Sequence, residues 1–84
     1  MAYTVNLKRS SEKELDDLPK KIQDRITKKI ISLKENPRPI GIKKLQGREG
    51  YRIRVGNYRI LYTIDDFLKI VEILSILLRE DAYR

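Results

Sequence analysis

Apolar residues in the first half of the chain form one short alternating stretch and one longer helical stretch. A period-two pattern that predicts a strand opens the chain, with apolar residues at Tyr3, Val5 and Leu7. Spacings of three or four residues predict a long amphipathic helix further on, at Ile22, Ile26, Ile30 and Leu33. Ser11 and Glu14 have the spacing of a capping box, so we expect a shorter helix to begin there. Pro19 separates the two helices, and Pro37 stops the second.

The second half of the chain predicts three strands. Residues 51–64 alternate around Gly56-Asn57, a two-residue loop that favours a type II′ hairpin. Asp65-Asp66 indicates a second turn, and residues 68–78 are a mostly apolar stretch typical of a strand inside a sheet. Residues 38–47 form a basic connector. We therefore expect an α+β fold in the order β-α-α-β-β-β, with a helical hairpin packed on a four-stranded, largely antiparallel sheet.

The two-residue loop fixes which residues of the hairpin share a face. One face is expected to lie under the helices and carries Tyr51, Ile53, Val55, Tyr58, Ile60 and Tyr62. The other face carries three arginines, Arg52, Arg54 and Arg59. Like charges opposite each other destabilise a sheet by roughly 0.2–1 kcal/mol. We interpret the cluster as a phosphate site, because each guanidinium offers a planar fork of donors; a solvated strand face is the alternative.

Composition restricts the possible chemistry. The chain has 84 residues and a net charge of +7, and we expect one domain over residues 1–84. Segment 38–59 holds seven bases and one acid, which favours a polyanion or an acidic protein as partner. Cysteine and histidine are absent, which excludes the usual zinc sites and histidine bases, and we expect no cofactor. No apolar run reaches the ~18 residues of a spanning helix, so we expect a cytoplasmic protein without membrane contact.

The hairpin sequence YRIRVGNYRILY, from Tyr51 to Tyr62, resembles the hallmark of the RelE-like toxins of the RelE/ParE toxin–antitoxin superfamily. That family has a tyrosine followed by alternating basic and hydrophobic residues, a turn, and then tyrosine-arginine-hydrophobic-hydrophobic-tyrosine. The resemblance covers essentially the whole chain, including the closing Arg79 and Tyr83, and it implies the RelE-like microbial ribonuclease fold. Leu77-Leu78 departs from the glycine and the histidine or lysine that many relatives have before the last arginine.

The resemblance implies a type II toxin that cleaves mRNA in the ribosomal A site, beside the 16S rRNA, and so inhibits translation. An acidic, RelB-like antitoxin would neutralise it in a hetero-oligomer. The implied catalytic residues are Arg52, Arg54, Arg59, Arg79 and Tyr83. The candidate RNA-binding residues are Lys43, Lys44, Arg48, Arg52 and Arg54. We also expect two apolar residues, Leu61 and Leu78, beside the arginines.

RNA carries its own nucleophile, the 2′-OH, so cleavage here needs no metal. Arginine stabilises charge on the phosphate but cannot act as a base, since its pKa exceeds about 12. We hypothesise that Tyr83 takes the proton of the 2′-OH and that Arg79 stabilises the leaving oxygen. The alternative for Tyr83 is packing on the sheet. Two other functions stay open for the chain, a ParE-like inhibitor of DNA gyrase and a catalytically inactive RNA-binding relative.

Overall fold

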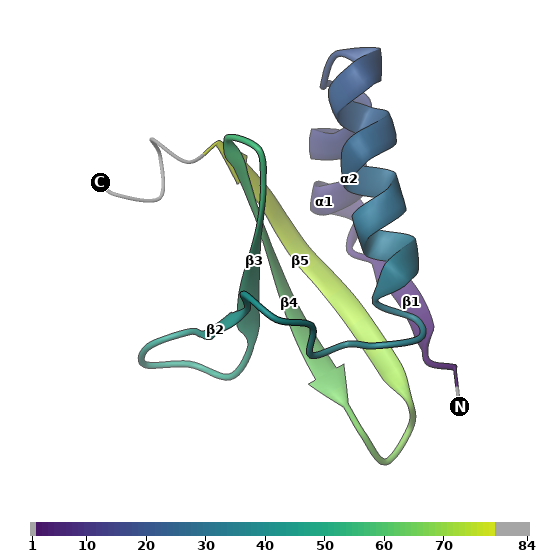
Figure 1. The fold of residues 1–84 in the computed structure, drawn as a ribbon, viewed down its shortest axis with the longest axis vertical. Coiled ribbons are helices and arrows are strands. Elements are labelled where there is room, and N and C mark those ends of the chain that lie inside the picture. Colours follow the sequence, from purple (N-terminus) through teal and green to yellow (C-terminus); the bar gives the residue numbers. More distant parts are fainter. Residues whose placement is uncertain (1, 79–84) are drawn as a thin grey trace.

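A computed structural model describes residues 2–78, in which two helices cover one face of a five-stranded sheet (Figure 1). The strand order is β1-β5-β4-β3-β2, with β1 and β5 parallel and the other neighbours antiparallel. The elements in chain order are β1 (Thr4–Leu7), α1 (Arg9–Asp16), α2 (Lys20–Ser32), β2 (Lys43–Lys44), β3 (Tyr51–Val55), β4 (Tyr58–Asp65) and β5 (Ile70–Leu78). The α+β class and the order of the predicted elements are confirmed.

The structure adds one strand, β2, to the four that the sequence predicts. β2 lies in the segment expected to be a connector, and its two lysines pair with Tyr51 and Arg52 of β3. Two adjacent lysines show no alternation of apolar and polar residues, so nothing in the sequence pattern indicates a strand there. The short strand is nevertheless important for the site, because it fixes the position of Lys43.

The capping box predicted at Ser11 and Glu14 is not formed. Lys8 is the N-cap of α1, so Ser11 lies inside the helix and is fully buried. Its hydroxyl lies 2.8 Å from the carbonyl oxygen of Lys8 and 3.1 Å from that of Ile73, within hydrogen-bonding distance of both. A carboxylate oxygen of Glu14 accepts the backbone N–H of Ile76 at 3.0 Å. The two side chains therefore fasten α1 to the edge of β5 where β1 has ended.

β5 contains a bulge that changes which of its residues face the helices. Leu61 pairs with Ser75 and Tyr62 pairs with Ile73, which leaves Leu74 as an extra residue in β5. Residues three apart on a regular strand face opposite sides, but the extra residue lets Ile73 and Ile76 both enter the core. Beyond the bulge, Leu77 shares the open face with its partner Arg59, and Leu78 shares the helix side with Tyr58.

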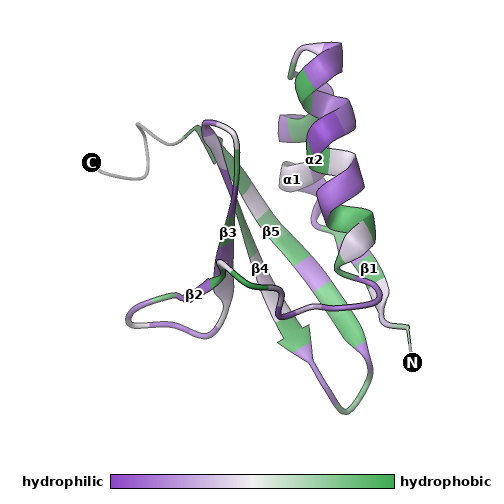
Figure 2. Cartoon of the chain, viewed as in Figure 1, coloured by the Kyte–Doolittle hydropathy of each residue, from purple (hydrophilic) through white to green (hydrophobic). Residues whose placement is uncertain are grey.

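The core lies between the helices and the inner face of the sheet. Figure 2 shows β5 as largely hydrophobic, whereas α2 alternates between hydrophilic and hydrophobic bands, as expected of a helix with one buried face. The buried apolar residues are Ile26, Ile30, Leu33, Ile53, Ile60, Tyr62, Val71, Ile73 and Ile76. Tyr62 also donates its hydroxyl to the carbonyl oxygen of Pro37 at 2.8 Å, which ties the connector to the core. Burial raises the pKa of Tyr62 to about 12, because a buried phenolate would lose its hydration.

Candidate nucleic-acid interface

An open concavity of about 360 Å³ lies on the sheet face that the helices leave uncovered. Strands β2, β3 and β4 supply its charged side chains, and the loop before β2 supplies a glycine. The lining residues are Gly41, Lys43, Arg52, Ile53, Arg54 and Arg59. All four charged side chains in the lining are cationic. A concavity of this kind suits an anionic ligand such as the phosphate backbone of a nucleic acid.

The three arginines share a face because the hairpin has the predicted register. Val55 pairs with Tyr58, and Arg54 pairs directly with Arg59. Gly56 has a φ of 59°, whereas Asn57 has no positive φ, which is the signature of a type II′ turn. Glycine is required there because other residues rarely adopt a positive φ at that position. The backbone geometry of the turn therefore sets the register that places the three arginines on one face of the sheet.

The arginines lie at different depths in the concavity. Arg59, on a strand inside the sheet, is only 4% exposed, Arg52 is half-buried, and Arg54 is exposed. Arg59 therefore lies at the floor and Arg54 at the rim. A cation that is partly removed from water interacts more strongly with an anion than an exposed one does. The arrangement would hold a phosphate group with charge-assisted hydrogen bonds from the guanidiniums.

Apolar side chains border the cluster on the side of β5. Leu61 lies across from Arg52, and Leu77 lies across from Arg59. The expectation for Leu61 is confirmed, but Leu78 is on the helix side because of the bulge in β5. Leu77 takes the position that the sequence assigned to Leu78. The open face thus combines cations with neighbouring apolar surface, which suits both the phosphates and the bases of a single-stranded nucleic acid.

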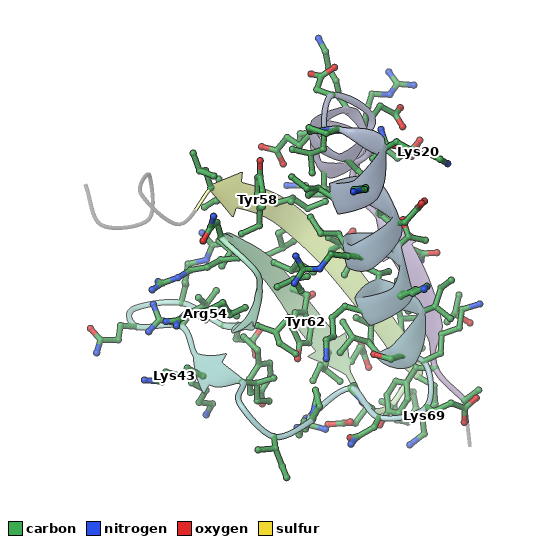
Figure 3. All side chains as sticks on the ribbon, turned by 45° about the horizontal axis from the view of Figure 1, so that its top comes forward. Lys20, Lys43, Arg54, Tyr58, Tyr62 and Lys69 are labelled. Carbon is green, nitrogen blue, oxygen red and sulfur yellow. The ribbon has the colours of Figure 1, made fainter. Side chains whose placement is uncertain are left out.

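The other two basic candidates, Lys44 and Arg48, do not line this concavity. Lys44 pairs with Tyr51 and so lies on the opposite side of β2 from Lys43. Both residues line a second concavity of about 390 Å³, together with Arg38, Tyr51 and Asp66 among others. In Figure 3 the side chains of Lys43 and Arg54 project on the side away from the helices. The two neighbouring lysines therefore line different concavities.

Two predicted site residues, Arg79 and Tyr83, lie outside the described residues. Within residues 2–78, no group of three or more acidic residues could hold a metal ion. The same part of the chain contains no helix that is long and apolar enough to cross a membrane.

A network around Asp66 was not predicted from the sequence. Both oxygens of Asp66 accept hydrogen bonds from Arg38, at 3.1 and 2.8 Å, and one also accepts the hydroxyl of Tyr3 at 2.7 Å. The bonds from Arg38 and Tyr3 hold the pKa of Asp66 at about 2. Arg38 also lies over the ring of Tyr51, 5.5 Å from its centre. Arg38 therefore fastens the connector to the turn before β5. The two residues are 28 positions apart in the sequence, so no local pattern indicates that they pair.

Residues 5–83 match the profile of the family described as the ParE toxin of the type II toxin–antitoxin system, parDE. The match extends over nearly the whole chain, and the chain belongs to this family of type II toxins.

Within the superfamily, the chain is similar to RelE toxins. It is 37% identical over its full length to a candidate toxin, RelE1, of Methanocaldococcus jannaschii, and covers 98% of that protein. It is 33% identical to the toxin RelE of Mycobacterium tuberculosis, with 98% of this chain and 87% of that protein covered. The crystal structure of the RelE–RelB complex from Pyrococcus horikoshii matches at a TM-score of 0.85 and 30% identity, covering 94% of this chain and 97% of that chain. The protein is a RelE-like toxin.

Proposed function

We propose that this toxin cleaves mRNA in the ribosomal A site and thereby inhibits translation. The concavity lined by Arg52, Arg54 and Arg59 is the observation that supports this most, because it offers several fixed guanidiniums to one phosphate. Bordering Leu61 and Leu77 would contact the flanking bases. The 16S rRNA around the A site and the mRNA itself are the polyanions that the net charge of +7 favours.

The proposed reaction needs no metal, because the substrate 2′-OH attacks the adjacent phosphorus. The arginines stabilise the charge that develops on the phosphate oxygens. By the resemblance to RelE toxins, Tyr83 accepts the proton of the 2′-OH and Arg79 stabilises the leaving oxygen. Lys44 and Arg48 contact RNA outside the reaction centre, since they line the second concavity and not the one that holds the arginine cluster.

A RelB-like antitoxin is the proposed partner, in a toxin–antitoxin hetero-oligomer. The relative from Pyrococcus horikoshii was crystallised as a RelE–RelB complex, and it has the fold of this chain. An acidic segment that becomes ordered on binding would complement the cationic face of the toxin. Charge complementarity would mainly accelerate association, while apolar contacts would slow dissociation.

The test is primer extension on mRNA in purified translating ribosomes. We expect cuts within the A-site codon for the wild type. Arg54→Gln should cut about 100-fold more slowly, which is the usual effect of removing one charge-stabilising donor. Arg54 is exposed, so this variant should fold normally. Arg9→Gln, an exposed substitution on α1, is the matched control and should cut as the wild type does.

A second candidate function is inhibition of DNA gyrase, because the matching family profile is named for ParE. A supercoiling assay with purified gyrase separates the two. Inhibition of supercoiling without any cut in mRNA would favour the gyrase function. A-site cuts with unaffected supercoiling would favour the ribonuclease.

A further inference from the structure

Proton transfer is the part of the proposed reaction that the arginine cluster cannot perform. Arginine is too weak an acid to serve as a proton donor, so Arg52, Arg54 and Arg59 supply charge and hydrogen bonds only. Among the described residues that line the concavity, Lys43 is the one whose side chain can release a proton and take it back. No carboxylate stands among those described lining residues.

β2 holds Lys43 at the concavity. The antiparallel pairing with β3 places Lys43 directly opposite Arg52, and partners in such a pair lie on the same face of the sheet. Both ends of the short strand are anchored. Ile42 packs against the core, and the N–H of Leu45 donates to the carbonyl oxygen of Gly50 at 3.0 Å. A lysine on a free loop would sample many positions, whereas this one starts from a fixed backbone.

We propose that Lys43 is a catalytic residue that donates a proton to the leaving 5′ oxygen. This role rests on the proposed ribonuclease function. The 2′ oxygen loses its proton to the phenolate form of Tyr83, the base of the proposed function, and forms a bond to phosphorus. The bond between phosphorus and the 5′ oxygen breaks, and that oxygen takes its electron pair and a proton from Nζ of Lys43. The products are a 2′,3′-cyclic phosphate and a 5′-hydroxyl. Tyr83 then releases its proton to water, and Lys43 regains one from water.

An ammonium group is suited to this step, because lysine is protonated at neutral pH and arginine is too weak an acid to replace it. Among the described residues, the charged groups that line the concavity with Lys43 are the guanidiniums of Arg52 and Arg54 from β3 and of Arg59 from β4. They would hold the phosphate while the lysine serves the leaving group. The adjacent Lys44 cannot take this role, because it lies on the opposite side of β2.

The test uses synthetic mRNA in which sulfur replaces the bridging 5′ oxygen at the cleavage site. A thiolate leaves without protonation, so a proton donor is dispensable for this substrate. Lys43→Arg keeps the charge but cannot donate a proton. We expect it to cleave normal mRNA at least about 100-fold more slowly than wild type, which is typical of a lost general acid, and the sulfur mRNA at the wild-type rate. Lys13→Arg, on the exposed side of α1, should match wild type on both substrates.

Two results would overturn the role of Lys43. If Lys43→Arg cleaves normal mRNA as fast as wild type, the lysine contributes only charge. If it is equally slow on both mRNAs, the residue acts in positioning or as a base, and not on the leaving oxygen. In either case wild-type cleavage shows that the ribonuclease function stands. If wild-type toxin cleaves neither mRNA on ribosomes, the proposed function fails and the role of Lys43 fails with it. Circular dichroism of each variant shows whether its fold is retained.

Discussion

Replacing Tyr62 by phenylalanine should make the protein less stable at neutral pH, and this loss of stability should disappear at high pH. The tyrosine is fully buried, and its hydroxyl donates to the carbonyl oxygen of Pro37, which is itself buried. The substitution keeps the ring that fills the core and removes only this hydroxyl. It therefore isolates the contribution of one buried hydrogen bond between β4 and the connector.

The two magnitudes follow from the hydrogen bond and from the pKa. At pH 7 the variant leaves the carbonyl of Pro37 unpaired, which costs about 1–2 kcal/mol of unfolding free energy. Burial raises the pKa of Tyr62 to about 12, whereas an unfolded tyrosine titrates near 10. The stability from the neutral phenol is therefore complete below pH 10 and is lost as the pH rises toward 12. At pH 11 wild type has lost about 1.4 kcal/mol relative to the variant.

The assay is urea unfolding followed by circular dichroism at several values between pH 7 and 11. Wild type should be the more stable protein at pH 7, and the difference should shrink to nothing near pH 11. Tyr58→Phe is the control, because Tyr58 is only half-buried at the end of the hairpin. A difference between wild type and Tyr62→Phe that stays constant up to pH 11 would refute the argument that burial disfavours the phenolate.

Three further predictions concern stability and association. Asp66→Asn should unfold at a lower urea concentration than wild type at pH 7. The difference between the two urea midpoints should close as the pH falls from about 4 toward 2, because the hydrogen bond from Arg38 keeps the pKa of Asp66 at about 2. Equal urea midpoints at pH 7 would contradict this. Ile26→Ala should lose about 2–5 kcal/mol of unfolding free energy, measured by urea titration, because Ile26 is fully buried in the core; Ile31→Ala, at an exposed position of the same helix, is its control. In stopped-flow mixing with a RelB-like antitoxin, added salt should slow association strongly and change dissociation less, and an association rate independent of salt would exclude electrostatic steering.

Local patterns in the sequence predicted the parts of the fold that depend on neighbouring residues. The spacing of isoleucines gave α2, and Gly56-Asn57 gave the hairpin register that places Arg54 opposite Arg59. Features that need a distant partner were missed or misassigned. Ser11 matched a local capping pattern, yet its hydroxyl contacts the carbonyl of Ile73, 62 residues away. A local pattern cannot show such a contact, because the partner is known only after the sheet has formed.

The bulge in β5 shows how such a distant contact also determines the candidate site. Without the extra residue at Leu74, the strand would alternate regularly, and its end would present the opposite set of side chains to the open face. Regular alternation would put Leu78, and not Leu77, beside the arginines. The core requires the bulge, since Ile73 and Ile76 are both buried in it. The packing under the helices thus sets which apolar side chain borders Arg59 on the other face.

The arginine cluster lowers the stability of the fold, so substituting one of its arginines separates an effect on activity from an effect on folding. Arg54 and Arg59 lie directly opposite each other, an arrangement that costs roughly 0.2–1 kcal/mol in a sheet. The burial of nine apolar residues between the helices and the sheet outweighs this cost, because each contributes about 1.5–3 kcal/mol. Neutralising exposed Arg54 should therefore leave the protein as stable as wild type or slightly more so. Under the proposed function, a variant that folds at least as well but cleaves mRNA about 100-fold more slowly has lost a contact with its substrate, and its slower cleavage cannot be attributed to unfolding.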